Sequence, residues 1–186
     1  MKTIIVILSI TVLFAACTPK QQQNASDKTI DLKKTEQLGD SISMVLQQVL
    51  LQNVSSAMQK GGAPFAIQFC NEKALKLTDS IAELYDCKIQ RITDKNRNPV
   101  NLASEQDIDF IKQLETSNQK VLDIDSASVF YKPIKIPSKA CLSCHGTEQE
   151  IAPQTASLIQ KLYPNDKATG YSEGDLRGWW KIVFKK

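Results

Sequence analysis

The residues with the clearest chemistry are Cys141-Leu142-Ser143-Cys144-His145-Gly146. Cys-x-x-Cys-His is the spacing at which two thiols can add across the vinyl groups of one haem, with the adjacent histidine as its proximal axial ligand. The motif therefore predicts one covalent haem c, attached through Cys141 and Cys144 and ligated by His145. The other elements of the chain must then build a pocket for it.

Three other uses of this motif stay open from the residues alone. Two cysteines and a histidine can bind zinc if a fourth ligand, here Cys70 or Cys87, completes the site. A thioredoxin-like redox pair requires a βαβ context, and none surrounds the motif. The third possibility is a structural cluster without chemistry.

The start of the chain favours export. Met1-Lys2 followed by an apolar run over residues 4–16 is typical of a secretory signal, and the run is too short to stay in the bilayer as a spanning helix. It ends in Ala15-Ala16-Cys17, which resembles a bacterial lipobox despite the bulky Phe14. We therefore expect residues 1–16 to be a lipoprotein signal peptide. A lipid on Cys17 would anchor the protein on the extracytoplasmic side of a bacterial membrane, either in the periplasm or at the outer membrane. The alternative is an ordinary signal peptide that is cleaved without lipidation.

Length, charge and the remaining cysteines set further limits. The sequence has 186 residues. Without the predicted signal peptide, the remaining chain is long enough for one domain with a sizeable core. A formal net charge of +3 argues against a nucleic-acid partner. Cys70 and Cys87 remain after the haem motif and the lipobox have taken the other three cysteines. A disulfide between Cys70 and Cys87 is one option in an oxidising compartment.

Hydrophobic periodicity divides the rest of the chain into elements. Residues 17–31 are polar, which predicts a flexible tether before a domain over 32–186. A 3.6-residue period predicts a helix over 32–60, which Gly61-Gly62 ends, and Pro64 opens a second helix. The later predicted elements follow in order: a strand 87–93, a loop 94–101, a helix 104–116, strands 121–124 and 128–136, a helix 155–162, a loop 163–174 and a strand 178–185. This order predicts an α+β domain on an antiparallel sheet.

The composition of the chain limits which residues could be the sixth ligand of the iron. His145 is the only histidine in the chain, so the other ligand must be Cys, Met, Lys, Tyr, water or nothing. Met44 and Met58 fall at helical spacing, where methionine more often fills a core. Cys70 is favoured over these and over Cys87, because the second helix turns it inward. Beside it we expect a dry wall of Phe65, Ile67 and Phe69.

Arginines are few in this lysine-rich chain. Only Arg91, Arg97 and Arg177 are present, all in strand, loop or turn segments. A guanidinium group binds carboxylates bidentately, so all three are candidates to bind the haem propionates. The alternative is an ion pair that holds the fold, for example between Arg177 and Asp175 or Asp166.

Six blocks of sequence carry a family resemblance. They are Phe69-Cys70, residues 91–101, Tyr131-Lys132-Pro133, residues 141–146, residues 163–171 and residues 174–178. In this order they resemble the PAS-like c-type haem family, a domain found alone or as the extracytoplasmic sensor of membrane kinases. The resemblance implies a PAS-like antiparallel sheet with N-terminal helices, one covalent haem, proximal His145 and, by position, Cys70 as distal thiolate. The chain departs from similar sequences at Leu102-Ala103-Ser104, where we expect Ser104 still to cap the next helix.

Two function classes follow. The resemblance implies a sensor of redox state or small gases, in which a thiolate that holds ferric iron well and ferrous iron poorly would switch ligation. The alternative is a periplasmic electron-transfer cytochrome that keeps both ligands. We do not expect an enzyme, because no distal histidine is available as acid or base. Since no effector segment follows Lys186, we expect an unidentified redox or signalling protein as partner.

Overall fold

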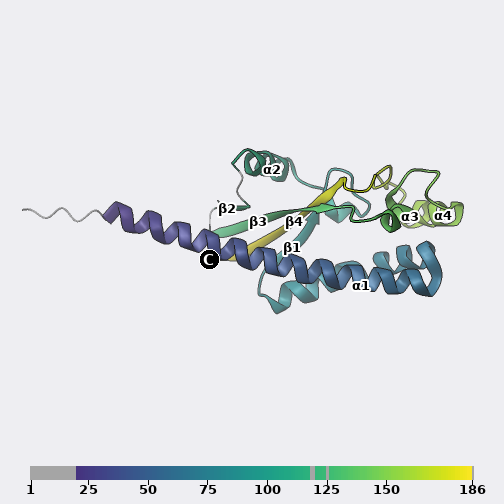
Figure 1. Ribbon diagram of the computed structural model, residues 1–186, viewed down its shortest axis with the longest axis horizontal. Helices are drawn as coiled ribbons and strands as arrows, with labels where there is room; N and C mark the ends of the chain where they lie inside the picture. Colours follow the sequence, from purple (N-terminus) through teal and green to yellow (C-terminus); the bar gives the residue numbers. More distant parts are fainter. Residues whose placement is uncertain (1–19, 118–119, 125, 186) are drawn as a thin grey trace, which may run out of the picture.

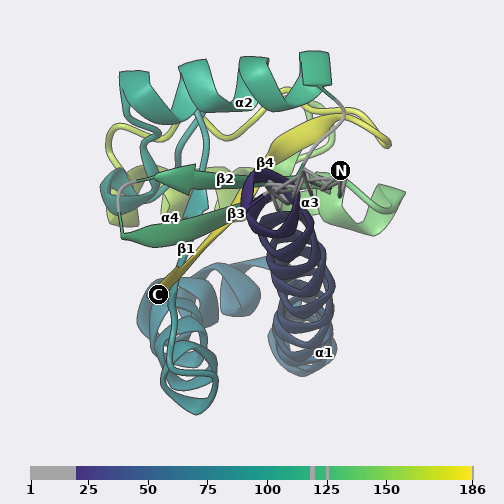
Figure 2. The same cartoon turned by 90° about the vertical axis from the view of Figure 1, so that its left-hand side faces the viewer.

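A long helical element, α1 (Lys20–Leu84), leads the part of the chain that the computed structural model describes, which is residues 20–117, 120–124 and 126–185. It consists of two helices that meet at Gly61 and Gly62, whose backbone angles are not helical. Gly62 has φ +66°, a conformation that residues with a side chain rarely adopt. Pro64 follows in the first turn of the second limb, where its missing N–H breaks no helical hydrogen bond. The predicted break is confirmed, and the second limb runs back beside the first (Figures 1 and 2).

The first limb begins earlier than the apolar pattern predicts. Residues 20–31 were expected to be part of a flexible tether, and the structure continues the helix through them instead. The prediction is wrong here because helix growth from a formed turn is far less costly than nucleation, so polar residues can extend a helix whose later turns are packed. The rest of the predicted tether, the predicted signal peptide 1–16 and Cys17 lie outside the described residues.

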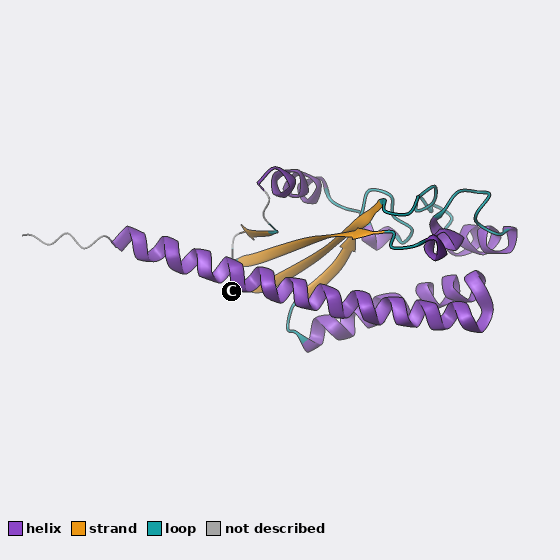
Figure 3. Cartoon of the chain, in the orientation of Figure 1, coloured by secondary structure: helices purple, strands orange, loops and turns teal. Residues whose placement is uncertain are grey.

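Four strands form one antiparallel sheet: β1 (Lys88–Ile92), β2 (Val121–Ile124), β3 (Ala127–Lys135) and β4 (Leu176–Lys185). Their order is β1-β4-β3-β2, so the last strand of the chain lies between the first and the third. The sheet lies between α1 and α2 (Glu105–Ser117) (Figure 3). The predicted α+β class with an antiparallel sheet is confirmed.

Side chains on β4 alternate between the two faces of this sheet, as the two-residue period of a strand requires. Trp180 and Ile182 pack with residues of α1, whereas Trp179 and Val183 belong to the cluster that α2 covers. Figure 2 shows α2 on one side of the sheet and both limbs of α1 on the other. The α1 side is the one that carries the candidate site.

A glycine allows the first limb of α1 to lie close to the sheet. Phe130 of β3 is fully buried and packs with Ile42 of α1. A Cβ placed on Gly39 would lie 2.4 Å from Cγ of Phe130, so a larger residue at this position would push the helix away.

The start of α2 confirms a local prediction. The backbone N–H of Asp107 donates to Oγ of Ser104 at 3.1 Å, and the N–H of Ser104 donates back to Oδ2 of Asp107 at 3.3 Å. This reciprocal pair is a capping box, so the departure at Leu102-Ala103-Ser104 leaves the cap intact.

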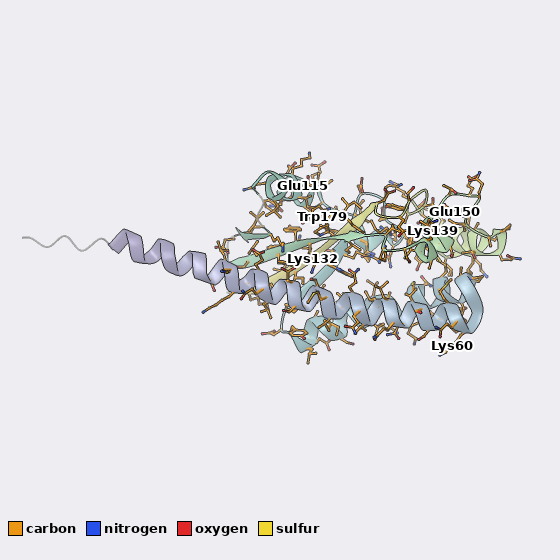
Figure 4. The ribbon with its side chains drawn as sticks, viewed as in Figure 1. Lys60, Glu115, Lys132, Lys139, Glu150 and Trp179 are labelled. Carbon is orange, nitrogen blue, oxygen red and sulfur yellow. The ribbon has the colours of Figure 1, made fainter. Side chains whose placement is uncertain are left out.

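Two short helices lie at the far end of the molecule from Lys20. They are α3 (Leu142–His145) and α4 (Pro153–Leu162), and α1 contacts both. In Figure 4, Lys60 marks the turn between the limbs of α1, at the same end as Lys139 and Glu150, which flank α3. Across the described ranges, none of the helices combines the length and apolar character needed to cross a bilayer.

Candidate functional site

Most of the residues singled out from the sequence line one cavity. It has a volume of about 230 Å³ and lies between the two limbs of α1 and the sheet. The predicted residues that line it are Cys70, Arg91, Arg97, His145 and Arg177. They come from the second limb of α1, β1, the following loop, α3 and β4, so the tertiary fold alone brings them together.

The apolar wall of the cavity differs from the one expected. Phe65 is 46% exposed, and Ile67 packs against Ile151, Ile159 and Tyr163 near α4, so the predicted wall is wrong. The turn at Gly61 and Gly62 places the first limb opposite the second, and both limbs and the sheet contribute to the wall. Its apolar members are Leu50 and Val54 from the first limb, Ala74 and Leu75 from the second, Ile89 from β1, Val100 from the loop after β1 and Trp180 from β4.

The imidazole of His145 is fixed through one ring nitrogen. Its Nδ1 lies 2.8 Å from the carbonyl oxygen of Ala168, and because a carbonyl only accepts, Nδ1 carries the hydrogen. In the neutral ring Nε2 therefore keeps its lone pair. Burial lowers the pKa of His145 well below its usual value, and the charges of Arg97 and Arg177 lower it further. A neutral imidazole whose Nδ1–H is held by a carbonyl is the usual arrangement of a metal-ligating histidine.

The loop 163–174 packs against the Cys-x-x-Cys-His segment through backbone hydrogen bonds. The backbone N–H of Gly170 donates to the carbonyl of Gly146 at 2.7 Å, and that of Tyr171 donates to the carbonyl of His145 at 2.9 Å. The ring of Tyr171 meets the imidazole edge-on, with ring centroids 6.2 Å apart. These contacts hold the short helix α3 against the rest of the domain.

Arg97 is engaged with protein groups. Its Nε and Nη2 donate to the two carboxylate oxygens of Asp166 at 3.1 and 3.0 Å, and Nη2 also donates to the carbonyl of Cys144 at 2.7 Å. Of the two uses left open for the arginines, Arg97 shows the ion pair. The pairing suggested for Arg177 with Asp166 or Asp175 is not present among the described residues, because Asp166 binds Arg97 instead.

Arg91 and Arg177 are cations without a carboxylate partner in the described part of the chain. Nε of Arg177 is buried and has no hydrogen-bond partner there, while Nη1 donates to the carbonyl of Lys95 at 3.3 Å. Burial lowers the pKa of both arginines, because it removes water from the charged form. An anion in the cavity would satisfy both groups.

The cysteines separate into different environments. Burial raises the pKa of Cys70, and the positive charges of Arg91 and Arg97 partly offset this rise. Burial also raises the pKa of Cys144, to about 11. Cys141 is half-buried. Cys87 packs with the core cluster around Ile42 and Phe130 and does not line the cavity.

The alternative uses of Cys70 and Cys87 receive no support. Both are free thiols, and the fourteen helical steps from Cys70 to Leu84 span about 21 Å, whereas a disulfide needs Cα atoms within about 7 Å. The disulfide alternative is therefore wrong. Among the described residues no three histidine, cysteine, aspartate or glutamate side chains are grouped to hold a metal ion, so the zinc site also lacks its ligand set.

Of the other side chains considered for the sixth iron position, the methionines lie elsewhere. Met44 is 60% exposed, and neither it nor Met58 lines the cavity. Tyr163 does line it, and burial raises the pKa of its phenol to about 12, as burial also raises the pKa of Cys70. Cys70 is the one thiol among the lining residues.

Three functional groups were not anticipated from the sequence. They are the carboxylate of Asp166 as partner of Arg97, the carbonyl of Ala168 as partner of His145, and Tyr163 in the cavity lining. All three lie in the 163–171 block that carried the family resemblance, which was the available signal. A backbone carbonyl has no residue type of its own, so no pattern could single it out.

Comparison with known proteins gives the family. The chain matches the Tll0287-like family over residues 19–184. Among solved structures it is similar to the cyanobacterial heme-protein Tll0287, with a TM-score of 0.59 and 22% sequence identity over 81% of this chain and 96% of that chain. A search of curated proteins finds no match. Since the family match spans nearly all of the sequence and the same fold recurs in the solved relative, the chain belongs to the Tll0287-like family.

Proposed function

We propose that this protein binds one haem c covalently through Cys141 and Cys144, with His145 and Cys70 as axial ligands, and acts as a redox or small-gas sensor. The observation that carries the proposal is the cavity itself. It places the thiol of Cys70 and the imidazole of His145 on one lining together with two arginines that lack an anion. The heme-protein relative supports the same cofactor.

The residues present fit a haem. Its two propionates are carboxylates, which the guanidinium groups of Arg91 and Arg177 can bind, since neither has a carboxylate partner among the described residues. Its apolar ring matches the aliphatic and tryptophan side chains that α1 and the sheet contribute to the cavity lining. When bound, haem supplies an iron that changes oxidation state and accepts axial ligands.

Cys70 is the residue through which a sensor would switch. A thiolate binds ferric iron more strongly than ferrous iron, so reduction would weaken its hold. Cys70 lies on the second limb of α1. If it held the iron, this limb would be tethered to the site differently in the two redox states. A partner that contacts α1 would detect this two-state element.

The second candidate is an electron-transfer cytochrome that keeps both ligands in both states. It is favoured by the place of Cys70, which is half-buried in the lining of the cavity between α1 and the sheet. Rapid binding of carbon monoxide to the reduced protein supports the sensor, and no binding supports the carrier. We propose no enzymatic activity, because no histidine is available on the distal side.

Covalent attachment is tested on the intact protein. Co-expressed with haem maturation machinery, it is expected to keep its colour after denaturation and acid-acetone extraction, because thioether bonds survive both. Cys141→Ser with Cys144→Ser should release the colour under the same treatment. Extraction of haem from the parental protein, or bound zinc in its place, would contradict the proposal.

Anchoring is tested through Cys17. We propose a lipid on this residue and a location on the extracytoplasmic side of a bacterial membrane, supported by the lipobox-like Ala15-Ala16-Cys17. Cys17→Ser is expected to move the protein from the membrane fraction to the soluble extracytoplasmic fraction, measured by fractionation and immunoblotting. Cys87→Ser is the matched control and should stay with the membrane. Unchanged membrane association of the Cys17 variant would refute the anchor.

A further inference from the structure

Ala168, whose carbonyl orients His145, has both of its backbone polar groups bound by one ion pair. The carbonyl oxygen of Ala168 accepts from Nδ1 of His145 at 2.8 Å and also lies 3.3 Å from Nη2 of Arg97. The N–H of Ala168 donates to Oδ1 of Asp166 at 2.9 Å. The carbonyl that binds the imidazole thus contacts the cation directly, and the anion binds the N–H of the same residue, which belongs to the preceding peptide unit.

The ion pair is well placed to act electrostatically. The side chains of Arg97 and Asp166 are 7% and 6% exposed, and the fork geometry joins them at two points. Little water screens charges at this depth, so each exerts a larger field on its neighbours than it would at the surface. The third contact of Arg97, with the carbonyl of Cys144, brings its charge to the Cys-x-x-Cys-His segment itself.

We propose that the Arg97–Asp166 pair sets the reduction potential of the site by acting on His145 through the carbonyl of Ala168. The inference rests on the proposed haem function and deepens it. Arg97 and Asp166 are positioning residues, since they act on His145 through Ala168 and neither contacts Nε2 of the imidazole.

The two charges act in opposite directions. Arg97 withdraws electron density from the Ala168 carbonyl, which weakens it as an acceptor and makes Nε2 of His145 a poorer electron donor. A poorer donor and a nearby positive charge both favour the reduced state, so Arg97 raises the potential. Asp166 neutralises Arg97 and supplies negative charge, so it lowers the potential.

The experiment measures the potential of purified haem-loaded variants by spectroelectrochemical titration. Arg97→Gln is expected to lower the potential and Asp166→Asn to raise it. The double variant should return toward the parental value, because both charges are removed. A merely structural role predicts shifts of the same sign, since either change loosens the same loop. Shifts of the same sign, or no shift in either variant, would overturn the proposal.

Two further variants keep the test decisive. Arg97→Gln leaves a buried carboxylate unpaired and is the variant most prone to misfold, whereas Arg97→Lys keeps the charge and is expected to stay nearer the parental potential. Asp109→Asn removes a carboxylate that is 77% exposed on α2 and should leave the potential unchanged. A shift from Asp109→Asn equal to that from Asp166→Asn would show a general charge effect and refute the specific route.

A measurement on haem-free protein separates this inference from the proposed function. The Nδ1 proton of His145 is expected to move downfield in the NMR spectrum of Arg97→Gln, where its acceptor becomes stronger, and upfield in Asp166→Asn. A parental protein that never acquires haem refutes the proposed function, and the NMR shifts still decide whether the pair acts on His145. Unchanged shifts in both variants refute the inference alone.

Discussion

Replacing Cys70 with alanine is expected to change the ferric protein from low-spin to high-spin, whereas Cys87→Ala should keep the parental spectrum. The reason is position: Cys70 lines the cavity with His145, and Cys87 packs into the core cluster of Ile42 on the same side of the sheet. Loss of an axial thiolate leaves water or no ligand in its place, which weakens the ligand field. Absorption and electron paramagnetic resonance spectra of the ferric variants measure the change.

The two cysteine variants serve as controls for each other. Both remove one half-buried thiol from the chain, so a general effect of cysteine loss on folding would alter both spectra. Far-ultraviolet circular dichroism should show the same helix content in both proteins. A low-spin parental spectrum in the Cys70 variant, or its loss in the Cys87 variant alone, would refute the ligand assignment and the proposed switch.

Asp107→Ala is expected to lower the free energy of unfolding by about 3–5 kcal/mol, because it breaks a buried charged network. The Asp107 carboxylate accepts from Nζ of Lys181 at 2.6 Å and from the hydroxyl of Tyr131 at 3.0 Å, and it completes the capping box with Ser104. Its removal leaves the hydroxyl of a fully buried tyrosine without this acceptor. Urea unfolding at neutral pH measures the loss.

The matched control is Asp109→Ala on the same helix. The Asp109 side chain is 77% exposed and its ion pair with Lys112 joins two surface groups, so the change should stay within about 0.5 kcal/mol. Equal losses from the two substitutions would indicate helix propensity as the cause and would contradict a role for the buried network.

The same carboxylate predicts a pH dependence. Burial by itself raises the pKa of Asp107, but hydrogen bonds from Lys181, Ser104 and Tyr131 outweigh burial and lower the pKa below its usual value. A lowered pKa in the folded state means that the stabilisation is complete above the unfolded pKa of about 3.9 and is lost as the pH falls through the folded pKa. The parental protein should therefore lose more stability than Asp107→Ala on acidification below about pH 4.

Local patterns in the sequence were enough to predict most elements of the fold. Gly61-Gly62 followed by Pro64 breaks α1 because glycine and proline act on their own backbone. The capping box of Ser104 and Asp107 joins residues three positions apart, and the β-branched and aromatic residues of 128–136 favour the strand observed as β3. The Cys-x-x-Cys-His chemistry is likewise contained in five consecutive residues.

The sequence by itself also indicated which residue types belong to the site, because a chain with one histidine and three arginines offers few choices. Only the tertiary structure decided what each of them does. Arg97 forms an ion pair with Asp166, 69 residues away, and Nε of Arg177 has no hydrogen-bond partner in the described part of the chain. The pairing of charged side chains depends on distances between segments that are remote in the chain. Hydrophobic periodicity in the sequence carries no information about those distances. The partner of His145 is a backbone carbonyl, which every residue possesses, so only the folded loop could select Ala168.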